Sequence, residues 1–244
     1  MLKQFSFIIP TLNEEKLLPT LLKQLTGPDL KSEYNYEIII SDGGSKDSTV
    51  KIAEEFADVV ITHNNPPKQN IAQGRNIGAQ KAHGEILIFL NGDVRIKDPK
   101  LFLKIINEKF YKSKFLAMTC KVEVFPEESK LIDKLFQSFY NYYFHFLNLA
   151  GLGMGRGECH VIPAEVFHDS GGYNTELAAG EDFELYKRLR RKGKILFERK
   201  LTVYESPRRY RKLGHFRILF TWLINSIYVF FMNKSLSKNW DEVR

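Results

Sequence analysis

The 244-residue sequence contains few cysteines and no long apolar run. Only Cys120 and Cys159 occur, and their spacing matches no metal-ligand pattern, so a disulfide-stapled scaffold is excluded and a reducing compartment is expected. The apolar run in the N-terminal MLKQFSFIIP is too short for a secretory signal, which makes the cytoplasm the expected location. The nearly apolar segment Ile218–Met232 would be about 22 Å long as a helix. A bilayer core is about 30 Å thick, so no membrane-spanning helix is expected.

Acidic residues are outnumbered, with 29 Asp and Glu against 36 Lys and Arg, which gives a net charge of +7. The excess is concentrated between Lys187 and Arg217, where thirteen basic residues accompany only two acids, Glu198 and Glu205. This balance suits an anionic partner such as a phosphorylated substrate or an acidic membrane surface. The basic residues adjoin an apolar tail and form no nucleic-acid-binding motif, so we expect no nucleic-acid partner.

Apolar strands alternate with helical patterns in the first half of the chain. Strands are predicted at Phe5–Pro10, Tyr36–Ser41, Val59–Thr62 and Glu85–Leu90, with helices around Leu17–Leu25, Asp47–Phe56 and Ile71–Ala82. This order is typical of a mostly parallel sheet flanked by helices. Three of the strands end in polar or glycine-containing loops. Ligands of such sheets bind outside the carboxyl ends of the strands, so these loops are expected to share one site.

The second half of the chain is less regular. A helix crowded with aromatic residues is predicted at Leu131–Leu149, and a second helix at Glu181–Lys192. Between them, the glycine-rich segment Gly151–Gly157 is expected to be mobile. The simplest division is a catalytic domain at residues 1–205 followed by a basic and apolar helical extension at residues 206–244.

Four segments occur in an order and spacing that resemble those of family 2 glycosyltransferases with the GT-A fold. They are IIPTLNEE (Ile8–Glu15), SDGGSKDST (Ser41–Thr49), GRNIGAQKAHGEILIFLNGD (Gly74–Asp93) and GEDFELYKRL (Gly180–Leu189). The resemblance covers about residues 4–200. It implies the GT-A fold and transfer of a sugar from a nucleotide-sugar donor with inversion at the anomeric carbon.

The loop after the first strand carries the first set of candidate binding residues. The resemblance implies that Pro10, Thr11, Leu12 and Glu14 hold the base and ribose of the donor, with the Glu14 carboxylate accepting ribose hydroxyls. A structural alternative is that Asn13 caps the following helix and the two acids after it favour the helix N-terminus.

Two further residues are assigned to the nucleotide. The resemblance implies that Asp42 accepts an N–H of the base, although an acid followed by two glycines also suits a plain turn. Family members commonly carry a second adjacent acid, and Gly43 occupies that position. Arg75 could contact the base or the phosphates, or it could be an exposed helix arginine.

Asn91-Gly92-Asp93 lies where the family places its Asp-x-Asp metal motif. The resemblance implies that Asp93 binds a divalent metal, Mn²⁺ or Mg²⁺, because charge develops on the leaving diphosphate as the sugar departs. Asn91 replaces the first acid and offers only a neutral oxygen. Asn-Gly between apolar runs also favours a hairpin, but the continuous apolar run before it is typical of a buried parallel strand.

The candidate base and a candidate phosphate clamp lie further along the chain. The resemblance makes Glu181-Asp182 the general-base pair, with Asp182 preferred, while an acidic helix start for dipole stabilisation is the alternative. Arg208 and Arg209 could clamp a diphosphate through bidentate hydrogen bonds, or could form a solvated basic face.

The tail and the aromatic helix suggest where the acceptor is found. Ile218–Met232 behind a basic stretch is typical of a helix lying in a membrane interface, or of a helix docked on protein. We therefore expect peripheral contact with the cytoplasmic face of a membrane and a lipid-linked or glycan acceptor. Whether the chain is a monomer or a homo-oligomer stays open. The alternatives are a nucleotidyltransferase, which would need a glycine-rich phosphate loop after the first strand, and a non-catalytic protein on a degenerate transferase fold.

Overall fold

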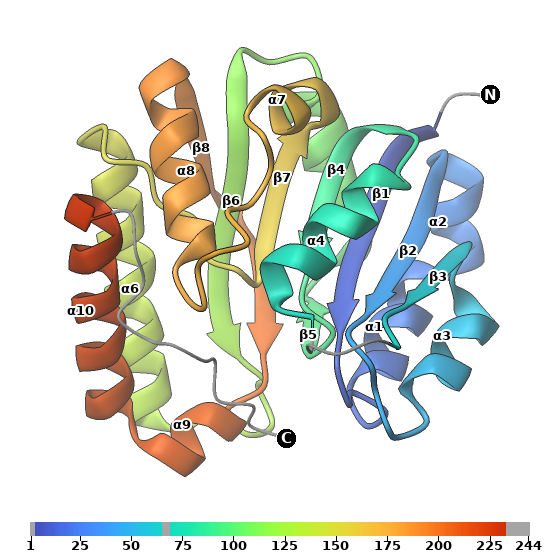
Figure 1. The fold of residues 1–244 in the computed structure, drawn as a ribbon, viewed down its shortest axis with the longest axis horizontal. Coiled ribbons are helices and arrows are strands. Elements are labelled where there is room, and N and C mark those ends of the chain that lie inside the picture. The colour runs from blue at the N-terminus through green and yellow to red at the C-terminus, as the bar shows by residue number, and fades with distance from the viewer. Residues whose placement is uncertain (1–2, 65–68, 233–244) are drawn as a thin grey trace.

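The alternating strands and helices build one curled eight-stranded sheet in the computed structural model, which describes residues 3–64 and 69–232 (Figure 1). The strands are β1 (Lys3–Thr11), β2 (Tyr36–Asp42), β3 (Val59–Thr62), β4 (Gly84–Leu90), β5 (Val94–Ile96), β6 (Phe115–Val124), β7 (Cys159–Pro163) and β8 (Lys194–Glu205). Their order across the sheet is β3-β2-β1-β4-β7-β6-β8-β5. The first four strands in this order, β3, β2, β1 and β4, pair in parallel. Strand β7 runs antiparallel to both β4 and β6.

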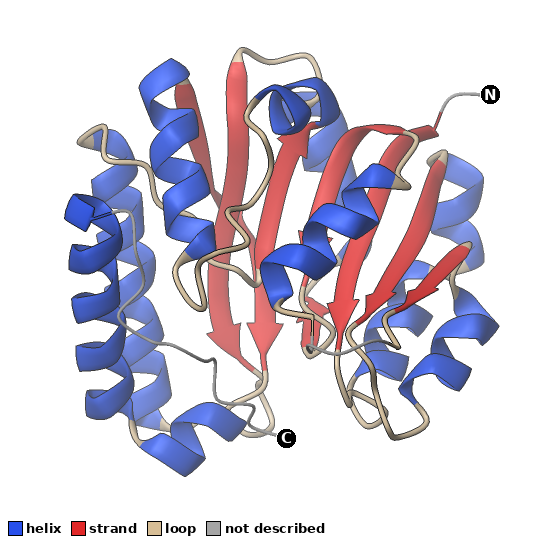
Figure 2. Cartoon of the chain, in the orientation of Figure 1, coloured by secondary structure: helices blue, strands red, loops and turns tan. Residues whose placement is uncertain are grey.

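Helices cover both faces of this sheet (Figure 2). They are α1 (Leu18–Leu25), α2 (Pro28–Glu33), α3 (Thr49–Phe56), α4 (Ile71–Gln80), α5 (Pro99–Ile105), the π-helical turn η1 (Ile106–Phe110), α6 (Leu131–Leu149), α7 (Ala164–Asp169), α8 (Glu181–Lys192), α9 (Arg208–Leu213) and α10 (His215–Met232). Figure 1 shows α4, α7 and α8 in front of the sheet and α1, α2 and α3 behind it. The fold class expected from the sequence is therefore found.

Residues of β1 divide between two hydrophobic cores on opposite faces of the sheet. Phe7 and Ile9 belong to the core beneath α1, α5 and η1, while Ile8 belongs to the core beneath α4, α7 and α8. Because successive strand side chains point to opposite faces, a strand covered on both sides is apolar at nearly every position. This is the physical reason for the continuous apolar runs seen in the sequence.

The start of helix α1 differs from one expectation. Helix α1 begins at Leu18 with Leu17 at its N-cap, and no side chain caps it. Asn13 instead adopts a left-handed backbone conformation with φ of 54°, and its Oδ1 accepts the backbone N–H of Lys46 at 2.8 Å. The expectation that Asn13 caps the following helix is therefore wrong. Its side chain joins the loop after β1 to the loop after β2.

Residues 206–232 pack onto the rest of the chain rather than standing apart. Trp222 of α10 lies against Tyr140 of α6, with ring centroids 5.4 Å apart, and Val229 is buried in the same apolar cluster as Phe183 of α8. Within the described ranges, no helix is both long enough and apolar enough to cross a bilayer.

Candidate active site

The carboxyl ends of β1 and β2 are tied together by the first set of predicted residues. The hydroxyl of Thr11 donates to Asp42 Oδ2 at 2.9 Å, and the Gly43 N–H donates to the Thr11 carbonyl at 2.8 Å. Asp42 is only 1% exposed, and its Oδ1 accepts the backbone N–H groups of Gly44 and Ser45. Its carboxylate therefore shapes the turn that faces the expected base, while Pro10 and Leu12 remain partly exposed on the neighbouring loop.

Arg208 links two of the predicted residues. Its Nη1 donates to Glu14 Oε2 at 3.0 Å, and its Nη2 donates to Asp93 Oδ2 at 2.9 Å. Arg208 lies in the first turn of α9, so the segment after β8 reaches back to the loops after β1 and β4. The structure thus brings the candidate ribose acid, the candidate metal acid and one arginine of the candidate clamp into one group. Arg209 is also partly exposed.

Arg75 is the buried centre of a second group. Its Nη1 donates to Glu181 Oε1 at 2.7 Å, and its Nη2 donates to Asn91 Oδ1 at 3.0 Å and to the Gly157 carbonyl at 2.8 Å. The side chain is fully buried, with its guanidinium carbon 5.0 Å from the centroid of the Tyr173 ring. Arg75 is therefore neither an exposed helix arginine nor open to a ligand. It holds the loop after β4 against the start of α8.

Asn91-Gly92-Asp93 connects β4 to β5, and β5 pairs with β8 rather than folding back on β4. The hairpin alternative is therefore excluded. A Cβ atom on Gly92 would lie 3.2 Å from Thr11 Cγ2 and 3.3 Å from Glu14 Cγ. Glycine at this position lets the candidate metal loop pack against the candidate nucleotide loop.

The two acids that open α8 have different surroundings. Glu181 is buried and bound to Arg75, whereas Asp182 is partly exposed. Asp182 Oδ2 accepts the Gly157 N–H at 3.0 Å, and its Oδ1 accepts the Phe183 N–H at 2.7 Å. Desolvation and the nearby charge of Glu181 raise the pKa of Asp182 to about 7. Asp182 is therefore the member of the pair that can reach a ligand and exchange a proton near neutral pH.

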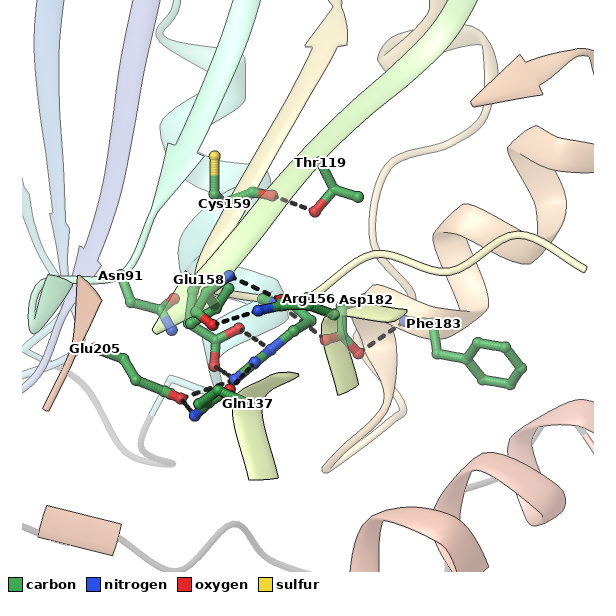
Figure 3. Close-up of polar contacts among 12 residues, drawn as sticks. Asn91, Thr119, Gln137, Arg156, Glu158, Cys159, Asp182, Phe183 and Glu205 are labelled. Atoms are coloured by element: carbon green, nitrogen blue, oxygen red, sulfur yellow. Dashed lines mark hydrogen bonds and ion pairs between the residues drawn. The ribbon is translucent and has the colours of Figure 1, made fainter. Parts of the chain in front are cut away.

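A buried ionic cluster beside these acids was missed by the sequence analysis (Figure 3). Arg156 is 4% exposed, and its guanidinium binds Glu205 at 2.9 Å and Glu158 at 3.3 Å. Burial raises the pKa of Glu205 to about 8, whereas Arg156 holds the pKa of Glu158 below its ordinary value against the effect of burial. Tyr210 of α9 donates to Glu205 at 2.6 Å, so the cluster also fixes the helix that carries Arg208.

The segment Gly151–Gly157 is packed rather than loose. A Cβ atom on Gly153 would lie 2.4 Å from the Tyr186 carbonyl oxygen, and one on Gly155 would lie 2.6 Å from the Tyr186 ring. Residues 153–156 are buried. Close packing, not chain mobility, accounts for these glycines, and the expectation of a mobile loop is wrong for this part. For the buried cluster around Arg156, the glycines at every second position before that residue were the one available signal in the sequence.

A family model described as glycosyl transferase family 2 matches residues 6–166. The chain belongs to this family. An uncharacterized glycosyltransferase of Haemophilus influenzae is 34% identical over 88 residues, covering 36% of this chain and 29% of that protein. The undecaprenyl-phosphate 4-deoxy-4-formamido-L-arabinose transferase of Proteus mirabilis is 32% identical over 98 residues, covering 38% and 30%. The matched segments thus span less than a third of these two relatives.

Solved structures show the fold of this family 2 chain. The mannosyltransferase from Pyrobaculum calidifontis, in complex with GDP-Man and Mn²⁺, superposes with a TM-score of 0.66 at 17% identity, covering 90% of this chain and 65% of that one. The GT-A fold expected from the sequence is confirmed.

The residues present fit a divalent metal in part. The described ranges contain no group of three or more His, Cys, Asp or Glu side chains that could hold a metal ion. Asp93, with a side chain 24% exposed, supplies one carboxylate, and Asn91 Oδ1 already accepts from Arg75. Such a site suits an ion that is held by one or two carboxylates and completed by substrate phosphates.

Proposed function

We propose that this family 2 chain is an inverting glycosyltransferase that moves a sugar from a UDP- or GDP-sugar to an acceptor hydroxyl or phosphate. The observation that carries the proposal is the pair of acids at the start of α8. Arg75 neutralises and immobilises Glu181, while Asp182 stays partly exposed with a pKa near 7. A base with such a pKa combines a usable ionised fraction at neutral pH with a strong tendency to take a proton.

In the proposed reaction, Asp182 accepts the proton of the acceptor O–H as that oxygen bonds to the anomeric carbon. The bond from the anomeric carbon to the diphosphate oxygen breaks on the opposite side, and the nucleoside diphosphate leaves with the electron pair. Only one base is needed, and no covalent link to the enzyme forms. The hydrogen bond from the Gly157 N–H fixes Asp182 Oδ2, so the proton acceptor keeps one orientation.

The donor is proposed to lie across the loops after β1, β2 and β4. Pro10, Thr11 and Leu12 would border the base, with the buried Asp42 setting the turn beside it. A bound Mn²⁺ or Mg²⁺ would offset the charge of the leaving diphosphate, and Asp93 is its proposed ligand. The Mn²⁺ and GDP-Man in the Pyrobaculum mannosyltransferase support a metal and a nucleotide sugar in general terms.

The proposed clamp is Arg208 with Arg209. The Arg208 guanidinium now bridges Glu14 and Asp93, so two carboxylates position it at the edge of the candidate diphosphate site. Arginine binds phosphate oxygens bidentately and keeps its charge at any relevant pH. In this proposal α9, at the start of the extension, is part of the donor site.

The acceptor is proposed to be lipid-linked and to be reached at a membrane surface on its cytoplasmic side. The support is the printed activity of the Proteus relative, which is named for undecaprenyl phosphate, together with the apolar helices α6 and α10 of this chain.

A donor panel tests the proposal. We would measure binding and hydrolysis of UDP- and GDP-sugars with and without Mn²⁺ for the wild type, Asp93→Ala and Asp182→Asn. Turnover of one donor that depends on Mn²⁺ and is lost in Asp93→Ala is expected. Asp182→Asn is expected to bind that donor normally and turn it over at least about a hundredfold more slowly. Failure to bind any donor would instead favour a non-catalytic protein on a transferase fold.

A further inference from the structure

One face of α6 exposes a continuous apolar stripe. Six of its side chains are between 57% and 73% exposed, namely Leu131, Leu135, Phe139, Tyr142, Phe146 and Leu149. At about 100° per residue, these six positions fall within about 80° of the helix circumference. The buried positions of α6, such as Tyr140 and Phe144, lie on the opposite side. We call these six residues the α6 stripe.

The rest of the described chain does not cover the α6 stripe. Helix α10 packs along a neighbouring flank of α6, where Trp222 contacts Phe136 and Tyr140. It adds exposed aromatic residues of its own, with Phe216 82% and Phe220 65% exposed. Contiguous exposed apolar surface of this kind marks an interaction site, whereas apolar residues scattered singly over a surface are ordinary.

A basic groove borders the other flank of the α6 stripe. This cavity of about 730 Å³ lies between α6 and the strands β6 and β8. Its described lining includes four cations, Lys121, Lys134, Arg199 and Lys200, against one carboxylate, Glu123. Arg199 also lies 5.7 Å from the centroid of the Tyr142 ring, so the cations of the groove directly adjoin the apolar stripe. We call this cavity the α6 groove.

An apolar stripe bordered by cations matches the chemistry of an anionic lipid surface. Aromatic and leucine side chains enter the boundary between headgroups and acyl chains, while lysine and arginine bind the headgroup phosphates. A second copy of the chain fits less well, because the two stripes would bring two α6 grooves of the same charge together. The net charge of +7 would add to this repulsion.

We propose that the α6 stripe and the α6 groove form the surface that docks on an anionic lipid bilayer. This inference deepens the proposed function, on which it rests for the lipid-linked acceptor, by assigning the membrane contact chiefly to α6 instead of to the C-terminal helix alone. The first turn of α6 also adjoins the candidate site. Asp133 in that turn binds Arg211 of α9 at 2.8 Å, three residues after Arg208. The helix that carries the docking surface is therefore joined through α9 to the candidate donor site.

Vesicle co-sedimentation of the full chain tests the apolar part. The probe is vesicles of phosphatidylcholine mixed with phosphatidylglycerol, at low salt. The double variant Phe139→Gln, Phe146→Gln is expected to lower the partition coefficient about tenfold or more, since each ring loses apolar burial. Val50→Gln is the control, because Val50 is partly exposed on α3, which packs on β2 and β3 away from α6. Equal losses in both variants, or no binding by the wild type, would overturn the proposal.

Separate variants test the basic residues of the α6 groove. Arg199→Gln with Lys200→Gln is expected to weaken binding to the anionic vesicles severalfold, and high salt is expected to do the same. Lys51→Gln, an exposed lysine on α3, should leave binding unchanged. Equal binding of the wild type to pure phosphatidylcholine would contradict the role of the groove. Inorganic phosphate that competes at millimolar concentration would instead identify a soluble phosphate ligand and overturn the membrane assignment.

Two further readouts separate this proposal from its alternatives. Sedimentation velocity without lipid reports the oligomeric state, and a wild-type dimer that the stripe variant dissociates would show that a second copy covers the stripe. Donor hydrolysis in the absence of lipid reports the catalytic site. Normal hydrolysis by the stripe variant, together with lost vesicle binding, would support the docking surface. Vesicle binding without hydrolysis of any donor would refute the proposed enzyme and leave the docking surface in place.

Discussion

The acid limb of the pH–rate profile tests the assignment of the catalytic base. Asp182 has a pKa of about 7, raised from an ordinary 3.8 by desolvation and by the charge of Glu181. Its ionised form is the one that takes a proton, so activity should be present above about pH 7 and should fall as the pH drops through that value. The fall should approach about tenfold for each pH unit below the pKa, or about fiftyfold between pH 7 and pH 5.

Glu181→Gln provides the perturbation that distinguishes the two acids. The substitution removes a negative charge that raises the pKa of Asp182, and it leaves the positive charge of Arg75, which lowers that pKa. The loss of the Glu181 charge and the retained Arg75 charge both favour ionised Asp182, so the acid limb of the profile should move to lower pH. Desolvation and this repulsion together raise the pKa of Asp182, so the folded state loses stability as the pH rises from 3.8 towards 7. The part of this loss that is due to Glu181 should disappear in the variant.

The assay is kcat/KM for donor turnover from about pH 5 to about pH 9. Glu184→Gln is the matched control, because Glu184 lies in the same turn of α8 but pairs with Arg188. Three results would refute the reasoning. The wild-type limb could lie near pH 4, the Glu181→Gln limb could stay where it was, or Glu181→Gln could be inactive while Asp182→Asn retains activity. The last result would make Glu181 the base.

Two other substitutions test the ionic links around the site. Arg208→Ala should weaken nucleoside diphosphate binding about tenfold, the cost of losing one charge-assisted contact, and Arg209→Ala should weaken it severalfold; calorimetry with UDP and GDP measures both, and unchanged affinity would leave Arg208 only a structural link. Asp133 has its pKa lowered to about 2, with Arg211, the Lys130 N–H and His215 outweighing its burial. Asp133→Asn should therefore cost about 2 kcal/mol of unfolding free energy at neutral pH. Urea titrations should show that difference disappear as the pH falls from 3.8 to 2, and a pH-independent difference would contradict it.

The first half of the fold was predictable because its physical signals are strong. Strands β1, β2 and β4 are buried on both faces, which demands unbroken apolar runs, and each run ends in a polar loop. The second half lacks those signals. Strand β8 mixes buried apolar residues with the exposed Arg199 and Lys200, and a register shift interrupts its pairing with β6. Its place between β6 and the edge strand β5 is a property of the whole sheet and cannot be seen in the local sequence.

The positions of the candidate residues followed from the sequence, but their contacts did not. Asp93, Glu14 and Asp42 lie at or just after the ends of β4, β1 and β2, and Asp182 lies in the first turn of α8. Their partners depend on segments far away in the chain, such as Arg208, which is 194 residues from Glu14. Composition and spacing carry no record of such pairings.

The neutral side chain at position 91 follows from these contacts. Besides Asp42 beside the proposed base, four carboxylates surround the candidate donor site, those of Glu14, Asp93, Glu181 and Asp182. Two buried or bridging guanidiniums, Arg75 and Arg208, oppose them. An aspartate at position 91 would compete with Glu181 for Arg75, because the Asn91 oxygen already lies 3.0 Å from that guanidinium. Glu181 would then be less neutralised, and its repulsion would push the pKa of Asp182 above the useful range. Asparagine accepts the same hydrogen bond without that charge, so the departure from two acids in this motif is consistent with keeping Asp182 a working base.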